Sequence, residues 1–109
     1  MKVLKAKTLH PKKIIIPIKD LTYIKSMNPL KELLEGEELI NPIEIEQHSI
    51  SKEQRIGSNG ALYVEKLYSV WRGSQRVKAA IQLGYTHIEA VIINEYNHKE
   101  KVWIEKTHI

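Results

Sequence analysis

The stretch that decides the fold is Tyr68–Gly84, YSVWRGSQRVKAAIQLG. It passes from an alternating, strand-like pattern into a helical one at Gly73, and Arg76 stands in the first turn of the expected helix. A helix carries the positive end of its dipole at the N-terminus, so a cation there is misplaced by roughly 0.3–1 kcal/mol. An anion bound at this junction is one explanation for the arginine.

The helix after the junction is predicted over about residues 75–83. Ser74 is the expected N-cap, and Gly84 can adopt the left-handed conformation that ends many helices. The helix has one apolar stripe for packing against a core. The members of that stripe are Val77, Ala80 and Ile81.

Strand patterns lie on both sides of this junction. Ile14–Ile18 is a run rich in β-branched residues, and Asn41–Glu46 and Leu67–Trp71 alternate apolar with polar positions. The polar segment between the last two contains the turn residues Gly57–Gly60, which predicts two neighbouring antiparallel strands. Ile88–Ile93 is the strand expected after the helix.

The remaining segments predict one short helix and one ambiguous tail. Asn28 and Pro29 are a typical N-cap and first helical residue, which places a helix at about 29–35. Residues 94–98 break the last strand pattern, and Lys99–Ile109 fits either a strand or a helix. The order strand, helix, strand, strand, helix, strand predicts a small α/β or α+β domain.

Composition limits the classes of protein to consider. A chain of 109 residues fits one domain, and the lack of cysteine excludes disulfides, thiolate metal sites and cysteine nucleophiles. A cytoplasmic protein is expected, because we find neither a signal peptide nor an apolar run of the ~18 residues that a membrane span needs. The net charge of +4 is compatible with a phosphate-bearing partner without establishing one.

Three features of the junction favour an anion, and phosphate fits best. Gly73 lets a ligand approach the backbone, the amides after Ser74 are unpaired donors, and Arg76 carries a planar guanidinium that can bind bidentately. Arg72 and Gln75 flank these groups. The structural alternative is an ordinary cap, a tight turn and a solvated arginine.

An ordered series of motifs resembles the ParB/sulfiredoxin-like superfamily. That family has a strand ending in a G-x-x-R turn, a helix with small residues, a Leu-Gly-Tyr corner and a further strand. The resemblance covers residues 13–93 and implies a small α+β fold, a mixed sheet with helices packed on it. It leaves residues 1–12 as a basic leader and residues 94–109 as a C-terminal extension. The matching segments are Ile16–Ile18 with Leu21, Glu38–Ile45, Leu67–Trp71, Gly73–Arg76, Ala79–Ala80, Leu83–Tyr85 and Ile88–Ile92.

The resemblance implies a nucleotide site, because the family's G-x-x-R turn cradles nucleotide phosphates. The implied ligand is a nucleoside triphosphate with Mg²⁺. Sulfiredoxins carry their catalytic cysteine where this chain has Ser74, so sulfinic-acid reduction is excluded. In the G-E-R-R turn of ParB proteins the first arginine corresponds to Gln75, which adds no charge. The residues expected at the site are Arg72, Gly73, Ser74, Gln75 and Arg76.

Family members that turn over nucleotides place a carboxylate after the first strand. Asp20 is the only acidic residue of Asp20–Pro29 here, so it is the one candidate for a catalytic group. We therefore expect a nucleotide-binding module without efficient catalysis. An Mg²⁺-dependent phosphotransferase or nuclease that uses Asp20 is the enzymatic alternative.

A third hypothesis is a DNA-binding or protein-interaction module of phage or plasmid type that has lost the nucleotide. Trp71 and Trp103 can either stack on a base or pack against the protein. The five histidines include no pair at helical spacing, so no metal site is predicted, while a homodimer remains open. The leader could follow a nucleic-acid backbone or simply be solvated. Its lysines are Lys2, Lys5, Lys7 and Lys12, with Lys13 directly after them.

Overall fold

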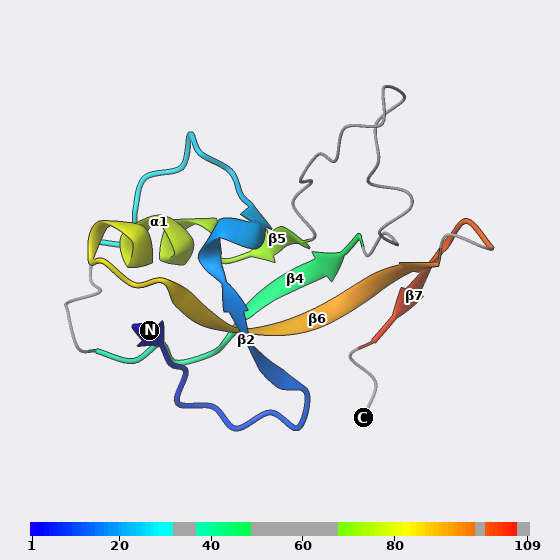
Figure 1. The fold of residues 1–109 in the computed structure, drawn as a ribbon, viewed down its shortest axis with the longest axis horizontal. Helices are drawn as coiled ribbons and strands as arrows, with labels where there is room; N and C mark the ends of the chain where they lie inside the picture. Colours follow the sequence, from blue (N-terminus) through cyan, green and yellow to red (C-terminus); the bar gives the residue numbers. More distant parts are fainter. Residues whose placement is uncertain (32–36, 49–67, 98–99, 107–109) are drawn as a thin grey trace.

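A mixed sheet with one helix against it organises the described part of the chain (Figure 1). The structure is a computed structural model that describes residues 1–31, 37–48, 68–97 and 100–106. Within these ranges the sheet has seven strands, and the α+β class predicted from the sequence is confirmed. The predicted turn at Gly57–Gly60 lies outside the described residues.

The longest strand, β6 (His87–Asn97), pairs with four others. β1 (Val3–Leu4) and β4 (Ile43–Gln47) run parallel to it. β2 (Lys13–Pro17) and β7 (Val102–Glu105) run antiparallel to it. The C-terminal half of β6 therefore carries β7 as well as β4, which extends the sheet away from the helix.

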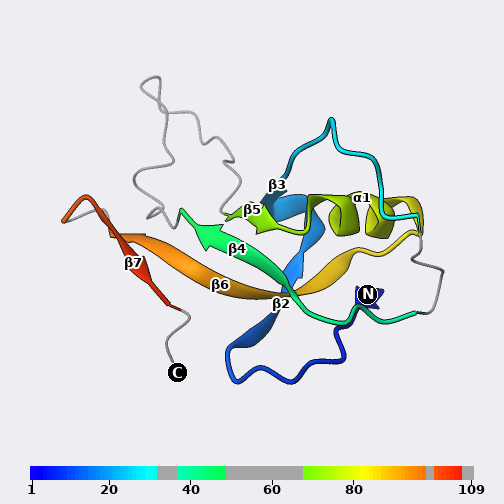
Figure 2. The same cartoon turned by 180° about the vertical axis from the view of Figure 1, so that it is seen from behind.

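The predicted antiparallel pair before the helix is confirmed as β4 and β5 (Tyr68–Arg72). Alternation in β4 buries Ile43 and Ile45 completely and leaves Glu44 and Glu46 half-buried. β3 (Leu21–Thr22) adds to β5 in parallel and is visible beside it from behind (Figure 2). A short 3₁₀ helix, η1 (Ile18–Asp20), links β2 to β3. The strand that leads into the turn, β5, is thus paired on both edges, with β4 and with β3.

Helix α1 (Ser74–Gln82) has glycines in left-handed conformation at both ends. At the C-terminal end Gly84 has φ 82°, its amide donates to the Ile81 carbonyl at 3.1 Å, and the Tyr85 amide donates to the Ala80 carbonyl at 2.9 Å. This is the Schellman arrangement, so the predicted role of Gly84 is confirmed. Burial of Val77 and Ala80 joins the helix to the sheet.

The predicted helix at 29–35 is corrected over its described residues. Residues 29–31 are not helical, and residues 32–35 lie outside the described part of the chain. The Leu30 amide donates instead to the Gln75 carbonyl at 3.0 Å, and the Leu30 side chain packs against the core. This bond and the packing of Leu30 hold the start of the predicted helix against α1.

The predicted break at 94–98 is wrong for residues 94–97, which continue β6. These residues are held by antiparallel pairing with β7, in which Asn94 faces Glu105 and Asn97 faces Val102. Of the two alternatives for the tail, the strand is therefore correct at Val102–Glu105. Cross-strand pairing keeps polar residues extended where their own pattern predicts a loop.

The segment expected as a basic leader contributes a strand and core side chains. Leu4 is fully buried and Ala6 nearly so, and both belong to the main hydrophobic cluster with residues of β4 and β6. The described part of the chain contains no helix long and apolar enough to cross a membrane. The fully buried large side chains of the core are Leu4, Leu21, Ile43, Ile45, Val77 and Ile88.

Candidate functional site

The turn between β5 and α1 depends on Gly73, the N-cap residue of the helix. Gly73 has φ 118° and ψ 17°, a conformation that side-chain-bearing residues rarely adopt. A Cβ atom at this position would stand 2.5 Å from Cγ2 of the buried Ile43. The glycine therefore lets the chain turn sharply while its backbone lies against the core.

Ser74 is the first residue of the helix and Gly73 is the N-cap, so the prediction of Ser74 as the N-cap is wrong by one position. Its side chain is buried, and its hydroxyl oxygen accepts a hydrogen bond from the Ile24 amide at 3.0 Å. No side chain caps α1 at its N-terminal end. The amides of the first turn, which have no partner within a helix, are therefore left for a ligand or for water.

The segment from Tyr23 to Lys31 passes over the N-terminal half of α1 (Figure 1). Three hydrogen bonds hold it there. Besides the bonds made by the Ile24 and Leu30 amides, the Lys78 ammonium donates to the Lys25 carbonyl at 2.5 Å. These bonds make the segment one wall of a cavity whose other wall is the turn.

This cavity has a volume of about 360 Å³ and is the candidate functional site. All five residues expected to bind phosphate line it, although they come from a strand end, a turn and a helix start. No acidic side chain is present among the described residues that form its walls. Those residues are Ile24, Met27 and Leu30 from the loop and Trp71, Arg72, Gly73, Ser74, Gln75 and Arg76 from the turn.

Arg76 is the half-buried charge of the cavity. Its Nη1 donates to the Asn41 carbonyl at 3.0 Å, just before β4. Burial lowers the pKa of the Arg76 guanidinium from its usual range, and the Glu44 carboxylate opposes that effect. A guanidinium stays charged at ordinary pH, so its desolvation favours a compensating anion. It also carries more N–H donors than the single bond to Asn41 uses.

Two exposed side chains complete the rim of the cavity. Trp71 has 61% of its surface exposed, so a planar ligand group can reach its ring. Arg72 is exposed on the same strand, and its Cα lies opposite that of Glu44 in β4. The rim thus offers an aromatic face and a second positive charge beside Arg76.

Asp20 lies away from this cavity. It ends η1 near Tyr68, where burial, and secondarily the Asp20 charge, raises the pKa of the tyrosine. Tyr68 begins β5 whereas Arg72, which lines the cavity, ends it, and these two residues are about 13 Å apart at about 3.3 Å per residue. Among the described residues no three histidine or acidic side chains are arranged to hold a metal ion.

Three of the five candidate lysines are engaged in contacts within the chain. The Lys2 ammonium donates to the Leu83 carbonyl at 2.9 Å and lies 4.6 Å from the centre of the Tyr85 ring. Lys12 donates to the Lys106 carbonyl at 2.7 Å. These contacts attach the N-terminal segment to the end of α1 and to the residue that follows β7.

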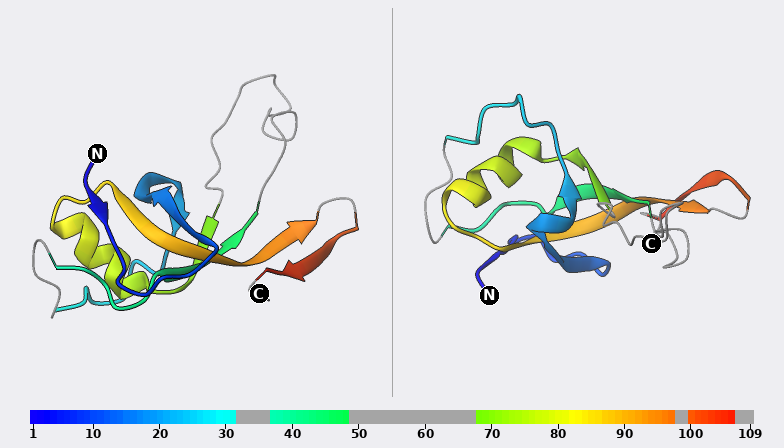
Figure 3. Two further views of the ribbon diagram at one scale, coloured as in Figure 1. Left: turned by 90° about the horizontal axis from the view of Figure 1, so that it is seen from below. Right: turned by 45° about the horizontal axis from the view of Figure 1, so that its top comes forward.

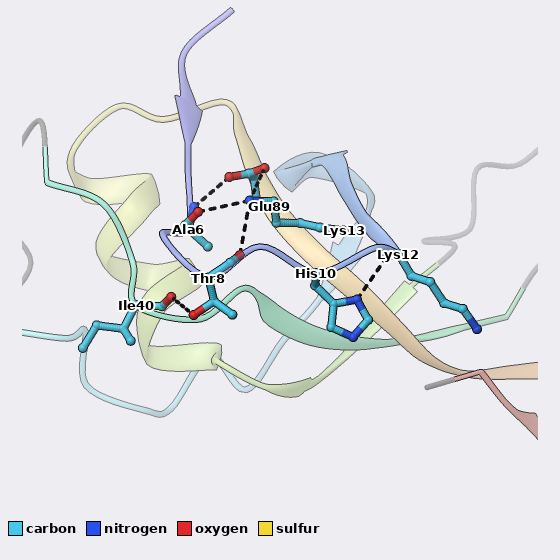
Figure 4. Close-up of polar contacts among 7 residues, drawn as sticks. All are labelled: Ala6, Thr8, His10, Lys12, Lys13, Ile40 and Glu89. Carbon is cyan, nitrogen blue, oxygen red and sulfur yellow. Dashed lines mark hydrogen bonds and ion pairs between the residues drawn. The ribbon is translucent and has the colours of Figure 1, made fainter. Parts of the chain in front are cut away.

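Lys13 is the most deeply placed of these lysines (Figure 4). Its ammonium is 3.3 Å from the Glu89 carboxylate, and both side chains are largely buried. Glu89 also accepts a hydrogen bond from the Ala6 amide at 2.7 Å, and Lys13 donates to the Ala6 carbonyl at 3.1 Å. Lys5, Lys7 and Lys12 are exposed, and of these three Lys12 donates its ammonium to the Lys106 carbonyl.

Sequence reasoning missed the opposite wall of the cavity and the residues behind Arg76. Ile24 and Met27 belong to a segment with no binding motif, and the strand pattern and family resemblance at Asn41 and Glu44 predict no contact with Arg76. The one available signal was the apolar character of Ile24 and Met27 within a polar loop. Comparison of the chain with family models, curated proteins and solved structures found no match.

Proposed function

We propose that this chain is a nucleotide-binding module of ParB/sulfiredoxin-like type that binds phosphate without efficient catalysis. The observation that supports the proposal is the convergence of Arg72, Gly73 and Arg76 on one cavity at the uncapped N-terminus of α1. Oriented amides, a helix dipole and two guanidinium groups are complementary to a phosphate.

Burial strengthens this electrostatic preference. In the partly desolvated turn the Arg76 charge interacts more strongly with an anion than a solvated lysine would. The helix dipole adds about 0.3–1 kcal/mol for an anion in this position. None of the described residues that form the walls is acidic, and Glu44, the carboxylate whose charge acts on Arg76, stands outside those walls.

The size and rim of the cavity favour a nucleotide over a free phosphate ion. About 360 Å³ lies within the roughly 300–1,000 Å³ range of small-molecule sites. The exposed ring of Trp71 can stack on a base, an interaction worth about 1–3 kcal/mol. The remoteness of Asp20 supports binding rather than turnover, because no described acidic group of the cavity could hold Mg²⁺ or accept a proton.

The test is calorimetric titration with ATP, CTP, GTP and their diphosphates, with and without Mg²⁺. We expect binding by the wild-type chain and a loss of about tenfold or more in Arg76→Ala, equivalent to about 1.4 kcal/mol. Lys5→Ala is the matched control, since it removes one charge from an exposed position outside the cavity. Its affinity should equal that of the wild type.

Arg76 also donates a hydrogen bond to the Asn41 carbonyl, so Arg76→Ala needs a folding control. Circular dichroism should show the wild-type secondary structure for Arg76→Ala and for Lys5→Ala. A further variant, Arg72→Ala, changes an exposed position and should weaken binding without a change in stability. If no nucleotide binds, or if Arg76→Ala binds as tightly as the wild type, the proposal is refuted.

The two alternatives stay as hypotheses. A nucleic-acid or protein-interaction module would have to use Lys5 and Lys7, because the other candidate lysines make contacts within the chain. A phosphotransferase or nuclease would have to use Asp20 at a second place in the fold. No contact among the described residues favours either function over nucleotide binding.

A further inference from the structure

Strand β7 is the outer strand of a hairpin that extends from the sheet on the side away from α1 (Figure 3). In the described part of the chain it pairs with β6 alone. All four of its residues are exposed, with exposed fractions of 45% for Val102, 45% for Trp103 and 38% for Ile104. An open strand edge that carries apolar side chains is a template for another strand.

The hydrogen bonds of the hairpin determine which backbone groups face the open edge. The Lys106 amide donates to the Ile93 carbonyl of β6 at 2.7 Å. Because backbone groups alternate between the two sides of a strand, those of Val102 and Ile104 also face β6. The amides and carbonyls of Trp103 and Glu105 therefore face outward.

The charge sequence around β7 is complementary to itself in one antiparallel register. In a pair of β7 strands related by a two-fold axis at Trp103, Lys101 of one copy lies opposite Glu105 of the other. Val102 then faces Ile104, and Glu100 faces Lys106. The segment that has this property is Glu100–Lys106, EKVWIEK.

The backbone is compatible with the same register. A two-fold axis at Trp103 places the outward-facing groups of one Trp103 against those of its copy, as an antiparallel hydrogen-bonded pair requires. A shift of one residue would set outward-facing groups against inward-facing ones and place Lys101 opposite Lys106. Hydrogen bonding allows registers that differ by two residues, and among these the opposite charges of Lys101 and Glu105 favour the axis at Trp103.

Trp103 is held in position for this contact. Its ring lies 5.1 Å from that of His48 and 5.2 Å from that of Tyr96, measured between centroids. The neighbouring Lys106 already pairs with Glu95 of the same chain at 3.2 Å. The pair between copies that we choose for the test is Lys101 with Glu105, because both side chains are exposed.

We propose that β7 is the contact through which two copies of this chain form an antiparallel, two-fold symmetric dimer. The open edge is covered by an identical edge, and each contact such as Lys101 with Glu105 occurs twice, as two-fold symmetry requires. This inference does not depend on the nucleotide, since β7 lies apart from the cavity at the start of α1.

The test is sedimentation velocity of the full 109-residue chain over a range of concentrations, with charge-reversed variants. We expect a concentration-dependent dimer for the wild type. Lys101→Glu and Glu105→Lys each place like charges opposite one another at two symmetric positions, and each should raise the dissociation constant about tenfold or more. The double variant Lys101→Glu/Glu105→Lys restores opposite charges and should recover most of the affinity.

Two further measurements separate this dimer from others and from misfolding. Circular dichroism checks that the single variants keep their fold, and Lys5→Glu controls for net charge. Hydrogen exchange should show the Trp103 amide more protected at high protein concentration. A wild-type chain that stays monomeric, a dimer insensitive to both single reversals, or a dimer whose Trp103 amide is unprotected would each overturn the proposal.

Discussion

Replacing Gly73 by alanine tests the geometry of the turn on which the candidate site depends. Two costs add in Gly73→Ala. The conformation at φ 118° costs a residue with a Cβ atom about 1–2 kcal/mol. The new Cβ also stands 2.5 Å from Ile43 Cγ2, and forcing a filled core to shift costs about 1–3 kcal/mol. We therefore expect a loss of about 2–5 kcal/mol in the free energy of unfolding.

Gly84→Ala is the matched control for this prediction. Gly84 also has a positive φ, of 82°, but nothing lies within 4 Å of a Cβ atom built on it. Gly84→Ala should therefore lower the free energy of unfolding only by the conformational cost, about 1–2 kcal/mol. Urea denaturation of the wild type, Gly73→Ala and Gly84→Ala measures the loss of unfolding free energy in each variant. The difference between the two losses gives the cost of the clash with Ile43.

The reasoning would be refuted if Gly73→Ala cost no more than Gly84→Ala. A double variant gives an independent check, since Ile43→Ala removes the Cγ2 atom that the new Cβ would meet. In the Ile43→Ala background Gly73→Ala should cost less than in the wild type, because the two positions are in direct contact. Equal costs in both backgrounds would show that no clash exists.

Two further predictions concern parts of the fold outside the cavity. Glu89→Ala should lower the free energy of unfolding by about 1–3 kcal/mol in urea denaturation, because it removes the acceptor of the Ala6 amide and the carboxylate partner of the largely buried Lys13; an unchanged midpoint would contradict this. The pKa of Tyr68 is raised above 10.0 by burial and then by Asp20, so the folded chain holds this proton more tightly than the unfolded chain. The stabilisation that comes from this raised pKa is full below about pH 10 and is lost as pH rises through the pKa of Tyr68 in the folded chain. Tyr68→Phe should therefore lose less stability than the wild type between neutral and alkaline pH, and equal losses would refute the assignment.

Much of the region from Tyr68 to Gly84 could be predicted because its signals are local. Gly73 and Gly84 bound the helix because only glycine adopts these left-handed conformations at low cost. Alternation predicted β4 and β5 because successive side chains of a strand point to opposite faces. These features depend on neighbours a few residues away.

The failures occurred where distant contacts outweigh local preference. The Asn28-Pro29 start was a sound helix signal, yet Leu30 donates its amide to Gln75 across the cavity. Asn94–Asn97 has the composition of a loop, yet pairing with β7 extends it. The burial of Leu4 could not be anticipated from a lysine-rich segment, because its neighbours in space belong to the rest of the sheet.

The sequence by itself determined that a strand, a glycine turn and a helix follow one another with Arg76 at the helix start. Only the tertiary structure decided what those groups meet. Ser74 bonds to Ile24, 50 residues away, and Arg76 bonds to Asn41, 35 residues away, so the cavity is closed by a loop that no local pattern connects to the turn. The physical reason is that backbone conformation follows from adjacent residues, whereas burial and hydrogen-bond partners depend on how the whole chain packs.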